Sequence, residues 1–326
     1  MPLARYRDAL PQLGGELFLT DGGIETTLIF HDGLELPLFA AFHLLKEPTG
    51  REALRRYYAL YLALAHEHGL GFILESPTWR ASPDWGEKLG YAADALEHAN
   101  RDAIALMREL RDGFAHEAPL VTSGCVGPRG DGYHPERTME PDEAQAYHAR
   151  QIRTFAATEA DLVTAITMTH TGEAIGVARA AQAAGMPVVV SFTLETDGRL
   201  PSGEALGDAI QAVDEATGAA PAYFMINCAH PSHFMGVLTG ASGWACRIRG
   251  VRANASKRSH AELDEAPDLD AGDPAELAAE HAALCRLLPA LNVLGGCCGT
   301  DQRHVAAICR ACAPSGGTGG STAAHA

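Results

Sequence analysis

The sequence has no apolar run long enough to cross a membrane. A transmembrane helix needs about 18 or more consecutive apolar residues, and none of the 326 residues belongs to such a run. The N-terminal segment 1–15 also lacks the continuous apolar core of a signal peptide. These absences exclude a membrane partner, and we expect a cytoplasmic protein.

An excess of positive charge is also missing. The chain has 25 Lys and Arg against 41 Asp and Glu, a formal net charge of −16. It contains no basic stripe or cluster of the kind that tracks a phosphate backbone. Nucleic acid is therefore excluded as a partner, and small molecules are the expected ones. The sequence leaves the oligomeric state open between monomer and dimer.

Eight cysteines are present in this long acidic chain without an export signal. In that context reduced thiols or metal ligands are favoured over a framework of disulfides. The positions of the cysteines on the predicted strands and helices distinguish reduced thiols from metal ligands.

Short apolar runs alternate with helix-like segments from one end of the chain to the other. The runs are apolar without clean alternation, which is typical of parallel strands buried on both faces. The predicted strands are 16–23, 71–77, 119–127, 161–168, 187–195, 222–228, 246–254 and 292–298. The predicted helices are 51–69, 87–113, 141–160, 172–185, 203–218 and 273–290, with another after the last strand.

Eight strands alternating with helices predict an α/β fold, a single-domain (β/α)8 TIM barrel over residues 1–313. A doubly wound sheet is the alternative, but no GxGxxG turn follows the first strand. The polar, acidic stretch 256–274 is expected to be a solvated loop. The Gly/Ser/Thr-rich segment 314–326 is expected to be a disordered tail.

Cysteines stand at the carboxyl ends of two predicted strands, where barrel enzymes carry their chemistry. Cys228 ends the sixth strand, and the doublet Cys297-Cys298 ends the eighth. Three thiolates converging on one tetrahedral zinc ion, at about 2.3 Å each, would leave a fourth position open for a substrate thiol. Glycines at 295, 296 and 299 would let the backbone turn so that both cysteines of the doublet face the metal. The alternative is that the three cysteines are small buried core residues.

Several motifs occur in an order that resembles a known family. They are "DGG" (21–23), "SPTWRAS" (76–82), "GCVGPRGDGY" (124–133), "INCAHP" (226–231) and "GGCCGT" (295–300). Together they resemble the homocysteine S-methyltransferases, a zinc-dependent barrel family, over roughly residues 16–312.

The resemblance implies site residues for metal and substrate. Zinc, as Zn2+, would be held by Cys228, Cys297 and Cys298. Substrate-binding positions would be Asp21, Gly22, Glu25, Thr78, Glu195 and Asn227.

One position departs from the family pattern. After the fourth strand the family carries a glutamate that holds the substrate's amino group, and this chain has Ile166 there. An isoleucine cannot pair with an ammonium group. The acids that would substitute for the missing glutamate are Glu25, Glu75, Glu173 and Glu195.

The resemblance implies a methyltransferase that moves a methyl group from an onium donor, S-methylmethionine or S-adenosylmethionine, to the thiol of homocysteine, giving methionine. Aromatic residues available to cradle a cationic donor are Trp79, Tyr133 and Phe192. Alternatives are an enzyme acting on another thiol or selenol, one linked to a corrinoid donor, or a barrel that binds zinc and thiol without catalysis.

Overall fold

Eight short parallel strands close a barrel in the order of the sequence. The computed structural model describes residues 4–132, 138–241, 243–266 and 268–313, so the predicted tail 314–326 and Tyr133 lie outside the described residues. The strands are β1 (Phe18–Leu19), β2 (Gly71–Glu75), β3 (Leu120–Val126), β4 (Leu162–Met168), β5 (Val188–Phe192), β6 (Pro221–Asn227), β7 (Ile248–Ala253) and β8 (Val293–Gly296). Nearly every strand residue is buried, as the uninterrupted apolar runs predict.

The barrel closes between its first and last strands. Phe18 of β1 is in register with Gly71 of β2 on one side and with Val293 of β8 on the other. The predicted single-domain (β/α)8 barrel is thereby confirmed, and the doubly wound alternative is wrong.

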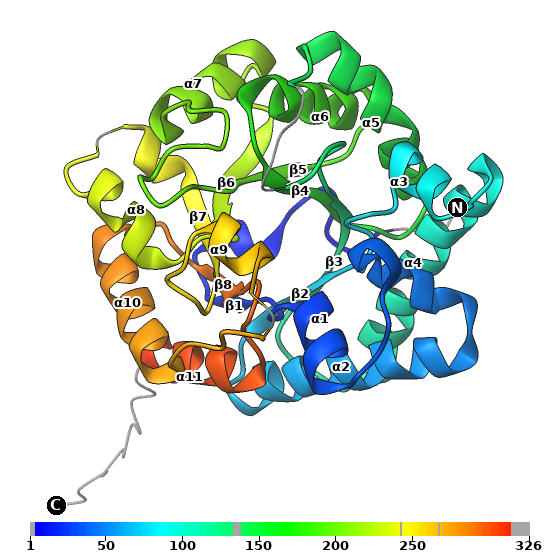
Figure 1. The fold of residues 1–326 in the computed structure, drawn as a ribbon, viewed down its shortest axis with the longest axis horizontal. Coiled ribbons are helices and arrows are strands. Elements are labelled where there is room, and N and C mark those ends of the chain that lie inside the picture. The colour runs from blue at the N-terminus through cyan, green and yellow to red at the C-terminus, as the bar shows by residue number, and fades with distance from the viewer. Residues whose placement is uncertain (1–3, 133–137, 242, 267, 314–326) are drawn as a thin grey trace, which may run out of the picture.

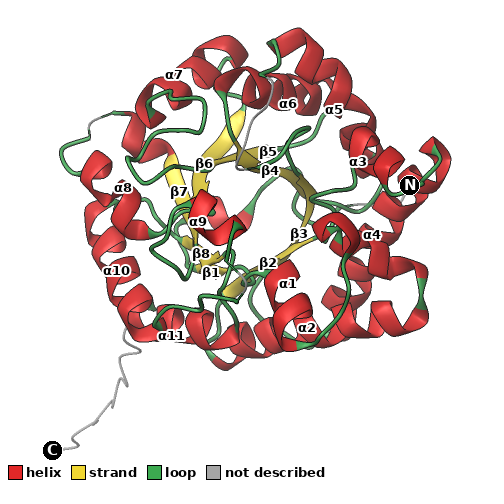
Figure 2. Ribbon diagram, viewed as in Figure 1, coloured by secondary structure: helices red, strands yellow, loops and turns green. Residues whose placement is uncertain are grey.

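Helices surround the barrel on all sides (Figure 1 and Figure 2). The longer ones are α2 (Pro48–Glu67), α4 (Ala93–Gly113), α5 (Pro141–Ala156), α6 (Thr171–Ala183), α7 (Leu206–Thr217), α8 (Pro231–Leu238), α10 (Pro274–Leu287) and α11 (Gln302–Cys312). The predicted helix 87–113 is divided, because α3 (Pro83–Lys88) ends before Gly90, which has a φ of +75°. α4 then begins at Ala93.

The barrel interior is apolar at one end and polar at the other. A buried cluster drawn from seven strands fills the first end: Phe18, Ile73, Val121, Leu162, Val189, Tyr223, Met225 and Val293. Toward the carboxyl ends, Ser123 donates a hydrogen bond to Glu75 and lies 2.8 Å from the hydroxyl of Thr164. The polar part of the interior thus lies toward the carboxyl ends of the strands, the usual location of chemistry in this fold.

The polar stretch 256–274 differs from its prediction. It contains α9 (His260–Asp264), which begins with a capping box between Ser259 and Glu262. His260 is buried, so this part of the stretch is not a solvated loop.

None of the helices in the described part of the chain combines the length and apolarity required to cross a membrane.

Candidate active site

Three cysteine sulfurs converge at the carboxyl end of the barrel. The Sγ atoms of Cys228 and Cys298 are 3.5 Å apart, and the sulfurs of Cys228, Cys297 and Cys298 all lie within 4.8 Å of one another. In a tetrahedral site with metal–sulfur bonds of about 2.3 Å, neighbouring sulfurs are about 3.8 Å apart. The three side chains therefore fit a single tetrahedral ion. Hydrogen bonds from the other two thiols hold the pKa of Cys297 well below its ordinary value, and the Arg252 charge acts in the same direction.

The glycines around the Cys297-Cys298 doublet have different structural roles. Only Gly299 has a positive φ, +79°, so it alone supplies the sharp turn expected of all three. Gly295 and Gly296 lie in β8, and a Cβ on either would clash with the hydroxyl of Thr20 or Thr300. Glycine is required at these two positions because Thr20 and Thr300 approach their backbone closely. The sequence interpretation, that both glycines serve a sharp turn, is therefore wrong.

Cys228 takes an unusual backbone conformation, with a φ of +56°. The residue before it, Asn227, is fully buried and clamps the strand ends around it. Its Oδ1 accepts hydrogen bonds from the amide of Thr167 at 2.9 Å and from the hydroxyl of Ser191 at 2.6 Å. Its Nδ2 lies 4.0 Å from the sulfur of Cys297. Asn227 thus touches the three-cysteine cluster (Cys228, Cys297 and Cys298) but does not line the pocket.

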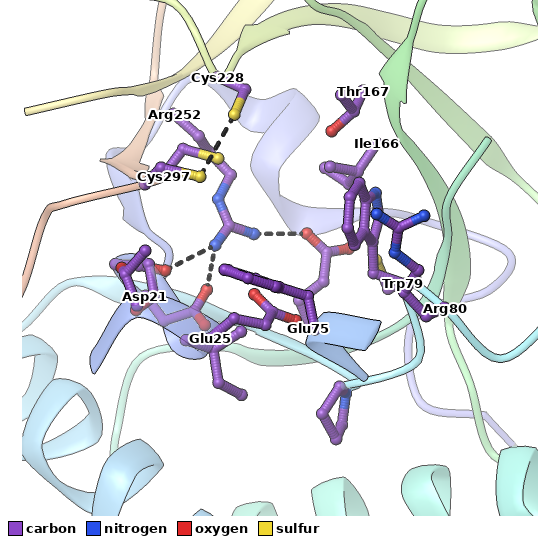
Figure 3. Close-up of a pocket in the computed structure, with 18 of the residues that line it drawn as sticks. Asp21, Glu25, Glu75, Trp79, Arg80, Ile166, Thr167, Cys228, Arg252 and Cys297 are labelled. Carbon is purple, nitrogen blue, oxygen red and sulfur yellow. Dashed lines mark hydrogen bonds and ion pairs between the residues drawn. The ribbon is translucent and has the colours of Figure 1, made fainter. Parts of the chain in front are cut away.

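A pocket opens beside the sulfurs, and Figure 3 shows its main side chains. All three cysteines line it. The other charged residues in its lining are Asp21, Glu25, Glu75, Arg80, Asp131, Arg252 and Asp264, and its bulky apolar and aromatic side chains are Ile24, Phe39, Tyr58, Trp79 and Ile166. The pocket is therefore acidic on balance and has an apolar wall.

Arg252 of β7 links two of the pocket's carboxylates (Figure 3). Its guanidinium donates to Asp21 at 2.5 Å and to Glu75 at 2.8 Å, and also to the carbonyls of Gly22 and Gly296. Burial raises the pKa of Asp21 to about 6, although the charge of Arg252 opposes that rise. Arg252 thus supplies a cation to both of these acids.

Sequence reasoning missed Arg252. The run 246–254 was interpreted only as a buried strand. A charged residue near the carboxyl end of such a strand is the signal that would have found it, because an arginine there is stable only beside buried acids.

Glu25, in the short helix α1 (Ile24–Thr26), also lines the pocket. Among the described residues, no hydrogen bond or ion pair joins its carboxylate to another side chain. Burial raises the pKa of Glu25 to about 7, and the negative charges of Cys297 and Asp21 add to that effect. A cation entering the pocket would find this carboxylate available.

The other acids considered as substitutes for the family glutamate are occupied. Glu75 is paired with Arg252. Glu173 accepts hydrogen bonds from the amide of Arg129 and from buried His148. Glu195 is paired with His260, and neither Glu173 nor Glu195 lines the pocket.

The remaining predicted positions are placed as follows. Asp21 and Gly22 line the pocket, as do Ile166 and Thr167 from the end of β4. Thr78 does not, because it is fully buried and its hydroxyl donates to the carbonyl of Cys125 at 2.7 Å. Of the candidate donor aromatics, Trp79 lines the pocket.

Phe192 is buried in the core, with its ring stacked on Phe224 at a centroid distance of 6.2 Å. It is therefore a packing residue.

Comparison with known proteins gives the chain its family. The family model described as homocysteine S-methyltransferase matches residues 18–312. Among curated protein sequences, none matches significantly. Solved structures of the homocysteine methyltransferase MmuM from Escherichia coli share the fold. Its oxidised form is 20% identical, with a TM-score of 0.75 over 94% of this chain and 99% of that one. Its metallated form is 20% identical, with a TM-score of 0.70 over 90% of this chain and 95% of that one. Because the family model spans nearly the whole barrel, the chain belongs to the homocysteine S-methyltransferase family and is a methyltransferase enzyme.

Proposed function

We propose that this enzyme transfers a methyl group from an onium donor, S-methylmethionine or S-adenosylmethionine, to the thiol of homocysteine, giving methionine, and that it depends on zinc. The observation that carries the proposal is the convergence of three cysteine sulfurs on one point of the pocket wall. A set of soft thiolate ligands with the spacing of a tetrahedral site favours zinc among the metals common in proteins.

Cys228, Cys297 and Cys298 would hold the ion. When bound, zinc supplies a Lewis acid that lowers the pKa of a substrate thiol, so that the thiol is a nucleophile at neutral pH. The protein itself keeps the reacting groups dry and aligned. Ile166 and Trp79 provide an apolar wall across the pocket from the sulfurs (Figure 3), and exclusion of water favours displacement between a thiolate and a cationic methyl donor.

We infer that Glu25 accepts the ammonium group of homocysteine. It lines the pocket and is close enough to Cys297 to feel the negative charge of its thiolate. No side chain in the described part of the chain forms an ion pair with its carboxylate. Arg252 pairs with Asp21 and Glu75, so these two acids have a cation already. Glu25 would thereby replace the glutamate that the family carries where this chain has Ile166.

The acidic and aromatic lining also supports a cationic donor. Trp79 lines the pocket, and the guanidinium of Arg80 lies over its ring at 4.4 Å from the centroid. An onium methyl group would be attracted to the same aromatic ring. Asp264 adds negative charge to the lining, whereas Asp131 is paired with Arg80 at 3.4 Å.

The proposal is tested by zinc content and turnover together. Elemental analysis of protein purified under reducing conditions should give one zinc per chain, and Cys298→Ala should lose it. Cys246→Ser, at an exposed thiol outside the pocket, is the matched control and should retain it. Wild-type protein should then form methionine from homocysteine with one of the two donors. Absence of zinc in the wild type would overturn the metal assignment, and zinc without methionine formation would overturn the acceptor assignment.

A further inference from the structure

The segment 254–266, which follows β7 and contains α9, makes hydrogen bonds to the main chain of the three-cysteine cluster. The amide of Ala255 donates to the carbonyl of Cys298 at 3.0 Å. His260 donates from Nε2 to the carbonyl of Cys228 at 2.6 Å. The segment therefore holds the main chain of two cysteines that follow different strands, β6 and β8.

The same segment reaches the pocket. Figure 1 shows α9 over the barrel opening beside β7 and β8, and Asp264 at its end lines the pocket. α9 is only five residues long, so its helical hydrogen bonds alone cannot hold it there. An anchor outside the helix is required.

His260 provides that anchor. It is only 4% exposed, although its neighbours Ala261 and Glu262 are exposed. Its Nδ1 lies 3.1 Å from a carboxylate oxygen of Glu195, which follows β5. Since a carbonyl and a carboxylate both accept hydrogen bonds, both ring nitrogens act as donors. Glu195 thereby fixes the orientation in which Nε2 points at Cys228.

The carbonyl that His260 contacts belongs to a residue in a strained conformation. Cys228 has a φ of +56°, in the left-handed region that a residue other than glycine adopts at a cost of roughly 1 kcal/mol or more. A short hydrogen bond on its carbonyl stabilises this conformation and with it the direction of the sulfur.

We propose that His260 is a positioning residue that fixes the Cys228 ligand and holds α9 at the mouth of the pocket, with Glu195 orienting its ring. Partners that orient metal ligands in this way change metal affinity about 10- to 100-fold when removed. The part of the proposal that concerns zinc rests on the proposed function. The part that concerns α9 does not.

Three variants test it: His260→Leu, which removes both hydrogen bonds; His260→Gln, which retains one side-chain donor; and Glu195→Ala, which frees the ring. The matched control is His233→Gln. His233 contacts the carbonyl of Lys257 in the same segment at 2.9 Å but touches none of the three cysteines. Circular dichroism and melting temperature first establish that each variant is folded.

The first readout is zinc affinity from competition with a chromogenic chelator. His260→Leu should bind zinc at least about tenfold more weakly than wild type, with Glu195→Ala and His260→Gln in between. The second readout is amide hydrogen exchange of residues 255–264 in metal-free protein, which should accelerate at least about tenfold in His260→Leu.

Wild-type zinc affinity in folded His260→Leu would overturn the positioning role, and unchanged exchange would overturn the anchoring role. If wild-type protein binds no zinc, the proposed function fails, while the exchange measurement still decides whether His260 holds α9.

Discussion

Asn227 and Thr167 are joined by two hydrogen bonds that lock the end of β4 to the end of β6. Oδ1 of Asn227 accepts from the amide of Thr167, and Nδ2 donates to its hydroxyl, each at 2.9 Å. Thr167 has a φ of +64°, so its backbone is strained. The buried side-chain amide of Asn227 stabilises a backbone conformation of Thr167 that the local sequence does not favour.

Asn227→Ala should lower the free energy of unfolding by about 3 kcal/mol, because it removes several hydrogen bonds and leaves buried partners unsatisfied. Urea unfolding measures this. The control, Ser191→Ala, removes only one hydrogen bond to the same oxygen and should cost about 1 kcal/mol. Equal effects of the two substitutions would contradict the clamp.

Arg252→Met should destabilise the fold by about 3–5 kcal/mol, since it leaves Asp21 and Glu75 buried without their cation. The combined variant Arg252→Met, Asp21→Asn, Glu75→Gln removes the unpaired charges and should recover much of that loss. Arg55→Met is the control. Arg55 pairs with Glu109 at the surface, and its loss should cost less than about 1 kcal/mol. Similar unfolding midpoints for Arg252→Met and Arg55→Met would refute the special role of the buried pairs.

Glu25→Gln should raise the KM for homocysteine about 10- to 100-fold, the equivalent of losing a hydrogen bond to a charged group. The kcat should change less, because the ammonium group lies away from the reacting sulfur. A thiol acid without an amino group, 4-mercaptobutyrate, should be methylated equally well by wild type and variant.

The control for this prediction is Glu117→Gln. Glu117 is exposed and precedes β3, at the opposite end of the barrel. An unchanged KM in Glu25→Gln would show that another group binds the ammonium.

His281 makes stability depend on pH. It is fully buried in α10, and burial lowers its pKa from 6.5 to about 4. Between these values the unfolded chain binds a proton that the folded protein does not, so stability is lost as the pH falls from 6.5 toward 4. The resulting loss in the free energy of unfolding amounts to about 3 kcal/mol at pH 4.

Unfolding free energies at pH 7 and pH 4 test this. His281→Gln should show a smaller loss between these two values than wild type. His98→Gln, at a side chain that is 75% exposed, should follow the wild-type profile. A His281→Gln profile parallel to wild type would disprove the contribution.

The fold was predictable from the sequence because the strands of a parallel barrel are buried on both faces. That burial requires apolar runs such as 187–195, and helices must cover the sheet between them. The division between α3 and α4 was missed because a single left-handed glycine, Gly90, interrupts an otherwise helical pattern. A glycine inside such a pattern does not reveal its φ.

The convergence of Cys228, Cys297 and Cys298 was predictable because strand ends of a barrel meet at one face. The contacts around it were not. Arg252, His260 and Glu195 come together from different loops and strands. Their pairing depends on the register of the sheet and on the position of α9, and local sequence patterns predict neither.

The closure of β1 against β8 has a consequence for synthesis on the ribosome. Two of the three cysteines directly follow β8, the last strand to be made, and the third follows β6. A nascent chain that has reached only α8 carries one of the three clustered cysteines, Cys228, and lacks the other two. Under the proposed zinc assignment, metal binding would therefore be a late event that accompanies the final docking of β8, and a chain arrested before that step would lack the complete ligand set.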